Sequence, residues 1–226
     1  MITISGHTIL ALPQPGDNVL DVGSHNYGFA NPCAKAGANV YCVEPDTDAP
    51  PSPHPYITLI RKAVYPVERT RNARLVKWSN GEGNHLDIVP GDRPKGATFQ
   101  ETPLISLQQL SVQWDVPLWD IIKLDCEGAE YPILLDLPGP IAKQITVEFH
   151  DFCSANPGGE KTHAAILAHI GQWYDIVQHE KTVVNTWSNY WDSLFVLKGT
   201  HVQVRRQGAL VSQDTAGPVG DSSSFV

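Results

Sequence analysis

The sequence predicts an α/β fold in which helices cover both faces of a mostly parallel sheet. Short apolar segments that fit β-strands alternate along the chain with longer segments that fit helices, and this alternation is typical of parallel sheets. Two of the predicted strands, 120–124 and 145–149, are almost continuously apolar, as strands buried on both faces are. A core of ordinary size is available, because 42% of the 226 residues are hydrophobic.

Strands are predicted where branched and aromatic apolar residues concentrate between turn-forming residues. In chain order they are 18–22, 39–44, 56–64, 74–78, 85–89, 119–125, 145–149, 174–178 and 193–197. The fourth and fifth flank a glycine-rich connection, which predicts a hairpin. The last two are expected to pair with each other at the end of the sheet.

Helices are predicted between these strands, at 29–36, 104–114, 128–137 and 160–173. Gly37 closes the first helix, and Ser106 is placed to cap the second. The third helix ends at Pro138, since proline cannot continue a helix. Five prolines between 45 and 55 predict a loop in that region.

The C-terminal end of the chain differs in composition from the rest. After about Gly208 the sequence turns to Ser, Gly, Asp and Pro, which do not build a packed core. We therefore expect a single domain over residues 1–207 and a mobile tail over residues 208–226.

Net charge and hydropathy exclude several classes of protein. Sixteen Lys and Arg against 24 Asp and Glu give a formal net charge of −8. This argues against a nucleic-acid partner, because binding phosphates needs a concentrated positive surface; the arginines Arg69, Arg71 and Arg74 are interpreted as solvated loop charges. No apolar run reaches the roughly 18 residues of a membrane span, and the first ten residues do not resemble a signal peptide. We expect a cytoplasmic protein without a membrane partner.

The four cysteines point to neither a zinc site nor a disulfide framework. Cys33, Cys42, Cys126 and Cys153 contain no C-x-x-C pair. Cys42 and Cys126 lie in apolar segments and are expected to be small core residues. Free thiols agree with a reducing compartment.

Acidic residues lie where four of the predicted strands end. They are Asp21, Glu44, Asp125 and Glu148. The carboxyl ends of parallel strands share one edge of the sheet, and ligands of open α/β sheets bind there. This row of carboxylates is the main functional signal in the sequence.

The turn after the first strand predicts a cofactor-binding loop. Gly23 and Gly28 permit positive φ angles and close approach to a ligand, and Ser24 lies between them. Glu44 follows Asp21 by 23 residues, a distance at which an acidic residue accepts hydrogen bonds from ribose hydroxyls. We expect these five residues to bind the cofactor.

The glycine spacing favours S-adenosylmethionine over a dinucleotide. A dinucleotide site needs G-x-G-x-x-G, but here four other residues separate Gly23 from Gly28, so the glycine that admits a pyrophosphate is missing. S-adenosylmethionine has a ribose and an amino acid but no phosphate, and its ammonium group needs an acceptor such as Asp21. Two alternatives stay open, namely a nicotinamide-dependent oxidoreductase and a non-catalytic interaction module on the same fold.

Residues at the ends of the predicted strands 119–125 and 145–149 supply candidates for catalysis. Asp125 and Glu127 could position the methionine part of the cofactor, orient a substrate hydroxyl, hold a cation or cap the next helix. Glu148 and His150 share a strand face, and His150, with Asp125 as the second candidate, is expected to be the general base. Lys123 is interpreted as a buried ion-pair partner of Asp125.

A divalent metal is the less favoured interpretation of this region. Asp125, Glu127, Glu148 and His150 could supply oxygen and nitrogen ligands. Their positions in the sequence lack the tight ligand spacing of a metal motif. We therefore expect no metal.

Four segments together resemble the FkbM-type S-adenosylmethionine-dependent methyltransferases. They are Asp-Val-Gly-Ser-His-Asn-Tyr-Gly at 21–28, Val-Glu-Pro at 43–45, Ile-Ile-Lys-Leu-Asp-Cys-Glu-Gly-Ala-Glu at 121–130 and Val-Glu-Phe-His at 147–150. The resemblance extends over residues 16–199, and Lys-x-Asp-x-Glu-Gly-x-Glu is its most specific part. The short N-terminal region and the proline-rich loop depart from the family pattern.

The resemblance implies a Rossmann-like class I methyltransferase fold, with a seven-stranded, mostly parallel sheet whose last strand is antiparallel. It also implies methyl transfer from S-adenosylmethionine to a hydroxyl of a sugar or another small natural product. By matched position, Asp21, Gly23 and Glu44 would bind the cofactor, and Asp125 would stand near it.

Overall fold

The computed structural model describes residues 1–52, 54–66, 72–78, 84–87, 96–150, 159–183 and 189–200. The predicted tail over 208–226 lies outside the described residues, as do Arg69, Arg71 and Cys153. No helix within the described ranges combines the length and the apolar character needed to cross a membrane.

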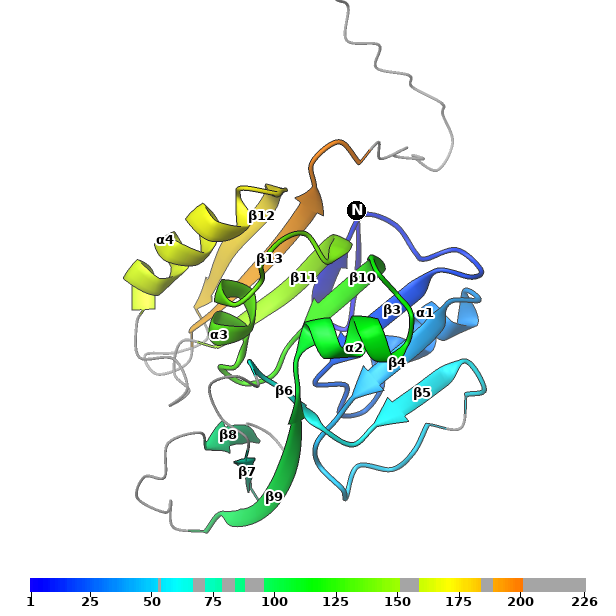
Figure 1. The fold of residues 1–226 in the computed structure, drawn as a ribbon, viewed down its shortest axis with the longest axis vertical. Coiled ribbons are helices and arrows are strands. Elements are labelled where there is room, and N and C mark those ends of the chain that lie inside the picture. The colour runs from blue at the N-terminus through cyan, green and yellow to red at the C-terminus, as the bar shows by residue number, and fades with distance from the viewer. Residues whose placement is uncertain are drawn as a thin grey trace, which may run out of the picture.

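Seven strands of the described chain form the large central sheet (Figure 1). They are β3 (Asn18–Val22), β4 (Asn39–Val43), β5 (Ile57–Ile60), β10 (Trp119–Leu124), β11 (Ala142–His150), β12 (Tyr174–Val183) and β13 (Asn189–Leu197). Their order across the sheet is β12-β13-β11-β10-β3-β4-β5. The last strand, β13, runs antiparallel to both of its neighbours, and the other pairs are parallel. This order and these directions confirm the predicted Rossmann-like class I methyltransferase fold.

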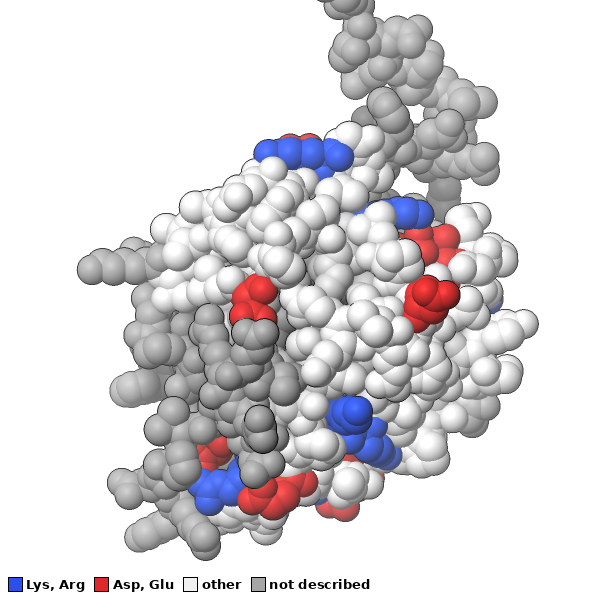
Figure 2. Space-filling model, viewed as in Figure 1, with Lys and Arg blue, Asp and Glu red and all other residues white. Residues whose placement is uncertain are grey.

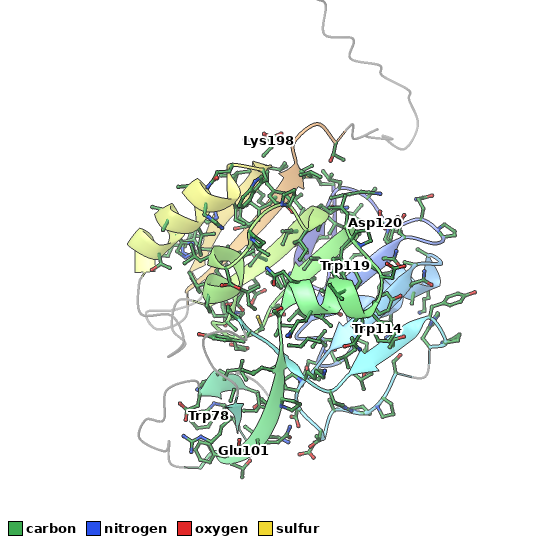
Figure 3. All side chains as sticks on the ribbon, in the orientation of Figure 1. Trp78, Glu101, Trp114, Trp119, Asp120 and Lys198 are labelled. Atoms are coloured by element: carbon green, nitrogen blue, oxygen red, sulfur yellow. The ribbon has the colours of Figure 1, made fainter. Side chains whose placement is uncertain are left out.

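Different elements cover the two faces of the large sheet. The helices are α1 (Ala30–Lys35), α2 (Leu107–Gln113), α3 (Glu130–Leu135) and α4 (Gly159–Ile170). Alternating residues of a strand face opposite sides, so Leu20 packs in the core beneath α2, α3 and α4, whereas Val19 packs against α1. Figure 1 shows α2, α3 and α4 in front of the sheet. Trp119, at the start of β10, is fully buried, and its indole nitrogen donates to Ser111 of α2 (Figure 3).

A smaller sheet lies beyond the carboxyl ends of the strands of the large sheet (Figure 1). Its strands, in the order β6-β9-β7-β8, are β6 (Ala63–Val64), β7 (Asn72–Lys77), β8 (His85–Asp87) and β9 (Thr98–Ile105). The antiparallel pairing of β7 with β8 confirms the predicted hairpin. The predicted strand over 56–64 is wrong in one respect, because it divides into β5 and β6. Between the two, the Arg61 guanidinium donates to the carbonyl groups of Asp46 and Ala49, and the chain turns there towards the small sheet.

The helix predicted over 104–114 begins later than expected. Its first residues belong to β9, which the sequence did not predict, and α2 starts after Ser106. The Ser106 side chain accepts from the Gln109 amide, and the Gln109 side chain accepts from the Ser106 amide. This reciprocal pair is a capping box, so the prediction of Ser106 as the N-cap is confirmed.

The N-terminal ten residues form a hairpin that the sequence did not predict. Strand β1 (Ile2–Ile4) pairs with β2 (His7–Ile9) through a turn in which Ser5 and Gly6 have positive φ. The hairpin packs on β11 and β13, on the face of the sheet that carries α1. Its turn brings His7 to the carboxyl end of β10.

Candidate active site

An open cleft lies where β3, β4 and β10 end. It has a volume of about 220 Å³ and is lined by Val22, Gly23, His25, Val43, Glu44, Pro45, Ala63, Val64, Leu75, Asn84, His85, Leu86, Asp125, Cys126 and Glu127. Strands β3 and β10 are neighbours in the sheet, although β4 and β5 lie between them in the sequence. The cleft therefore lies at the point where the strand order reverses, which is the usual ligand position in open α/β sheets.

Gly23 ties the loop after β3 to two neighbouring strands. Its amide donates to the carbonyl oxygen of Val43, at 2.9 Å. Its φ is +75°, and a Cβ atom at this position would lie 1.8 Å from the carbonyl oxygen of Asp125. Glycine is required here because the turn after β10 passes so close, a reason that the sequence did not reveal.

Glu44 presents a fixed carboxylate to the cleft. Its Oε2 accepts from the His25 amide and its Oε1 from the Asp46 amide, each at 2.9 Å. The side chain is almost buried, and these two bonds hold it in one orientation. Each carboxylate oxygen can accept more than one hydrogen bond. Glu44 can therefore accept further hydrogen bonds from the hydroxyl groups of a ligand.

The loop between Gly23 and α1 is held in a strained conformation. His25 and Tyr27 have φ angles of +32° and +60°, a region that costs non-glycine residues roughly 1–2 kcal/mol each. The Tyr27 hydroxyl donates to the carbonyl oxygen of Pro50, at 2.5 Å, which fixes the loop to the proline-rich segment. Such strain is common at ligand-binding sites.

Lys123 is the centre of a buried charge network under this loop. Its Nζ lies 3.2 Å from Oδ1 of Asp21 and 3.2 Å from Oδ2 of Asp125, and it donates to the Gly23 carbonyl oxygen at 2.6 Å. Burial disfavours the ammonium charge, but the carboxylates of Asp125 and Asp21 outweigh burial and raise the pKa of Lys123. Burial likewise opposes the charge of Asp125, and Lys123 nevertheless lowers the pKa of that carboxyl. The predicted ion pair of Lys123 with Asp125 is present, with Asp21 as a further partner.

Three of the predicted cofactor-binding residues do not reach the cleft. Asp21 is fully buried beneath the loop, level with Cys42 on the next strand. Ser24 is also buried, with 4% of its surface exposed. Gly28 packs on the N-terminal hairpin, where an added Cβ would lie 2.6 Å from the Ser5 hydroxyl. Asp21, Ser24 and Gly28 support the loop from below, and their direct contact with a cofactor stays a prediction.

The cysteines around Asp21 provide a test of this buried arrangement. Burial, together with the Asp21 carboxylate, raises the pKa of the Cys33 thiol to about 12 and raises the pKa of Cys42 as well. Because the thiolate is the reactive form, we expect iodoacetamide at pH 8 to leave both thiols unmodified in the native protein and to alkylate both after unfolding. Peptide mass spectrometry measures this. Native Cys42 that reacts as fast as unfolded Cys42 would contradict the placement.

His150 lies at the end of β11 among four carboxylates. Its Nδ1 is 3.1 Å from Oε1 of Glu130. Its Nε2 is 3.3 Å from Oε1 of Glu148, and 3.7 Å from both Oδ1 of Asp125 and Oε2 of Glu127. The imidazole is 2% exposed, whereas the side chains of Asp125, Glu127 and Glu148 are 25–29% exposed.

This environment does not suit the role of general base that the sequence predicts for His150. Burial alone would lower the pKa of the imidazole, but the surrounding carboxylates, Glu130 first, raise it well above its ordinary value. A raised pKa favours the protonated imidazole, which cannot accept a proton from a substrate; a cation bound at Nε2 would take the place of that proton. His150 instead joins the acidic residues of β10 and β11.

Two further residues belong to this cluster, and the sequence did not assign them to it. His7 is buried, and its Nε2 lies 3.4 Å from Oδ2 of Asp125. Glu130 is fully buried and accepts from the amides of Cys126 and Gly128, at 2.7 and 2.8 Å, so it fixes the turn that carries Asp125. Ser5 and Gly6, a turn-forming pair between apolar residues, could have indicated the N-terminal hairpin. Nothing in the sequence indicated that this hairpin places His7 beside the end of β10.

Comparison with known proteins gives remote structural similarity only. No model of a protein family matches this chain, and no curated protein matches it. The Methanococcus jannaschii fibrillarin pre-rRNA processing protein is 12% identical, with 86% of this chain and 71% of that chain covered and a TM-score of 0.47. A TehB-like SAM-dependent methyltransferase from Corynebacterium glutamicum is 11% identical (82% and 83% covered, TM-score 0.41). Magnesium protoporphyrin IX methyltransferase from Synechocystis, solved with bound SAM, is 14% identical (81% and 71% covered, TM-score 0.40). The fold assignment rests on the strand order and directions of the sheet itself.

Proposed function

We propose that this protein is an S-adenosylmethionine-dependent methyltransferase of the FkbM type, which methylates a hydroxyl group of a sugar or another small natural product. The observation that carries the proposal is the convergence of the Gly23 loop, the fixed Glu44 carboxylate and the Asp125 turn around one cleft. This cleft lies at the strand-order reversal of a seven-stranded sheet with an antiparallel last strand.

The cleft offers partners for each part of the methyl donor. Glu44 would accept hydrogen bonds from the ribose hydroxyls, and the apolar side chains of Val64 and Leu86 would pack against the adenine ring. Asp125 lines the cleft and is charged, so it would face the cationic methionine part of the donor. The role expected for the Asp21 carboxylate therefore passes to Asp125, while Asp21 acts through Lys123.

Methyl transfer would proceed by in-line displacement at the sulfonium methyl group. The acceptor oxygen forms a bond to the methyl carbon, the carbon–sulfur bond breaks, and S-adenosylhomocysteine leaves. Catalysis would come mainly from holding the two reactants in contact. The proton of the acceptor hydroxyl becomes strongly acidic as the new bond forms, so a weak base such as the Asp125 carboxylate can take it.

A small neutral acceptor fits the charge distribution better than a nucleic acid. The side chains of Asp125, Glu127 and Glu148 would repel phosphate groups near the reacting atoms. On the face seen in Figure 2, the described Lys and Arg residues lie in separate small groups among acidic residues. Arg74 is paired with Asp87, at 2.6 Å.

Calorimetric titration tests the donor assignment. We expect the protein to bind S-adenosylhomocysteine and not NAD, because the loop lacks the glycine that admits a pyrophosphate. Glu44→Gln should weaken S-adenosylhomocysteine binding about tenfold or more, since it removes a charged hydrogen-bond acceptor. Glu101→Gln, at an exposed position on β9, is the matched control and should bind as the wild type does. Tighter binding of NAD, or an unchanged affinity in Glu44→Gln, would contradict the proposal.

A further inference from the structure

We propose that Asp125, Glu148 and His150 form a binding site for a divalent cation beside the donor cleft, and that Glu127, which lies 3.7 Å from Nε2 of His150, joins them after a side-chain shift. One ligand atom each from Asp125, Glu148 and His150 lie within 4.8 Å of one another. Oxygen and nitrogen ligands lie about 2.1 Å from a transition-metal ion, so neighbouring ligands are roughly 3.0–3.4 Å apart in octahedral or tetrahedral geometry. The three carboxylate oxygens lie 3.3–3.7 Å from Nε2 of His150, and small side-chain shifts would complete the site.

Neighbouring residues already orient two of these ligands. Glu130 binds Nδ1 of His150, at 3.1 Å, which leaves Nε2 directed at the three carboxylates. His7 and Lys123 both contact Oδ2 of Asp125, which leaves Oδ1 on the side of His150. In protein metal sites, a ligating histidine almost always donates its other ring nitrogen to a carboxylate, carbonyl or water. The buried Glu130 fills that position here.

The charges of the cluster favour a cation. Five carboxylates share the single ammonium group of Lys123, so the cluster stays negatively charged even with His7 and His150 protonated; they are Asp21, Asp125, Glu127, Glu130 and Glu148. The partial exposure of Asp125, Glu127 and Glu148 leaves a path for an ion from solvent. Three carboxylates and one imidazole suit a divalent ion that accepts mixed oxygen and nitrogen ligands, such as Mn²⁺.

The position of the site gives the cation a role in the proposed reaction. Asp125 and Glu127 also line the donor cleft, so the ion would lie between the donor and the acceptor hydroxyl. A bound cation lowers the pKa of a coordinated hydroxyl group. With the cation bound, Asp125 would act as a ligand and not as the base, and the hydroxyl proton would pass to solvent as the methyl group is transferred. This role rests on the proposed function, whereas cation binding itself does not. The proposed site differs from the sequence-based expectation that no metal binds.

Electron paramagnetic resonance with Mn²⁺ tests the site directly. Chelator-treated full-length protein is titrated with Mn²⁺ alone, without a methyl donor, and the loss of the free-ion signal gives the Kd. We expect Glu148→Gln and Glu127→Gln each to bind Mn²⁺ at least tenfold more weakly than the wild type. Glu101→Gln lies on β9 of the small sheet, away from the proposed site (Figure 3). This variant should bind Mn²⁺ as the wild type does. Thermal unfolding of all four proteins verifies that they are folded.

The outcomes separate the cation site from the proposed function. The proposal is overturned if the wild type binds no Mn²⁺ at about 1 mM, the weak end of protein cation sites. It is also overturned if both Glu148→Gln and Glu127→Gln bind as tightly as Glu101→Gln. A parallel titration with S-adenosylhomocysteine tests the donor separately. Donor binding without Mn²⁺ binding removes the cation site alone, and site-dependent Mn²⁺ binding without donor binding supports the cation site and contradicts the methyltransferase proposal.

Discussion

The substitution Gly23→Ala is expected to lower the free energy of unfolding by about 2–5 kcal/mol and to abolish donor binding. The new methyl group would lie 1.8 Å from the Asp125 carbonyl oxygen, so either β10 or the loop must move, at a cost of about 1–3 kcal/mol. The positive φ at this position adds roughly 1–2 kcal/mol. Chemical denaturation measures the loss in stability, and calorimetry with S-adenosylhomocysteine measures the loss in affinity.

Gly16→Ala separates the cost of a positive φ from the cost of the steric clash. Gly16 also has a positive φ, of +90°, but no atom lies within 4 Å of the position of its Cβ. The substitution should therefore cost only the backbone term, roughly 1–2 kcal/mol, and leave donor binding unchanged. Equal destabilisation by Gly16→Ala and Gly23→Ala would contradict the close approach of the loop to the Asp125 turn.

Removal of the Lys123 charge is expected to be the most damaging change in the charge network. Lys123→Met would leave the fully buried Asp21 carboxylate without its cation and would remove the donor to the Gly23 carbonyl oxygen. Breaking a buried ion pair from one side costs about 3–5 kcal/mol. The variant should lose this amount in chemical denaturation and should lose donor binding with it, because Lys123 supports both Gly23 and Asp125.

Lys143→Met is the matched control for this loss. Lys143 also pairs with an aspartate, Asp120, but its side chain is 51% exposed, and pairs of this kind contribute about 0–1 kcal/mol. The double variant Lys123→Met with Asp21→Asn should recover part of the stability, since the unpaired buried charge is gone. A loss no larger in Lys123→Met than in Lys143→Met would contradict the account of the network.

The parallel part of the fold could be predicted from the sequence because its strands are buried on both faces. Strands such as β10 and β11 are continuous apolar segments, and the alternation with helices sets their direction. The small sheet and the N-terminal hairpin were harder to predict from the sequence. Strand β9 mixes polar and apolar residues in no regular pattern and includes Pro103, and β1 and β2 have only three residues each. Pairing with distant strands, and not local preference, determines these elements.

The candidate site could be located from the sequence, but the direction of its side chains could not. Glu44 and Asp125 follow β4 and β10, the strands on either side of β3, and both line the cleft, as their positions predict. Asp21 also ends a strand, yet it faces the α1 side and bonds to Lys123 instead. Ser24 is buried in a loop in which Gly23, His25 and Tyr27 have positive φ, and no sequence pattern specifies such a loop.

The remaining difference concerns His150, whose residue type suggests a base. Its surroundings decide otherwise, and they come from three separate elements: Glu130 from α3, Asp125 and Glu127 from the turn after β10, and Glu148 from its own strand. Histidine acts as a base when its neighbours leave it neutral. Only the assembled sheet edge reveals that four carboxylates meet around this imidazole.

A crystal structure of the protein grown with S-adenosylhomocysteine tests the position of the methyl donor. We expect density in the cleft between β3, β4 and β10, with the ribose hydroxyls within hydrogen-bonding distance of Glu44 and the homocysteine part beside Asp125. Density for the ligand elsewhere on the molecule, with Glu44 bonded only to the His25 and Asp46 amides, would contradict this expectation.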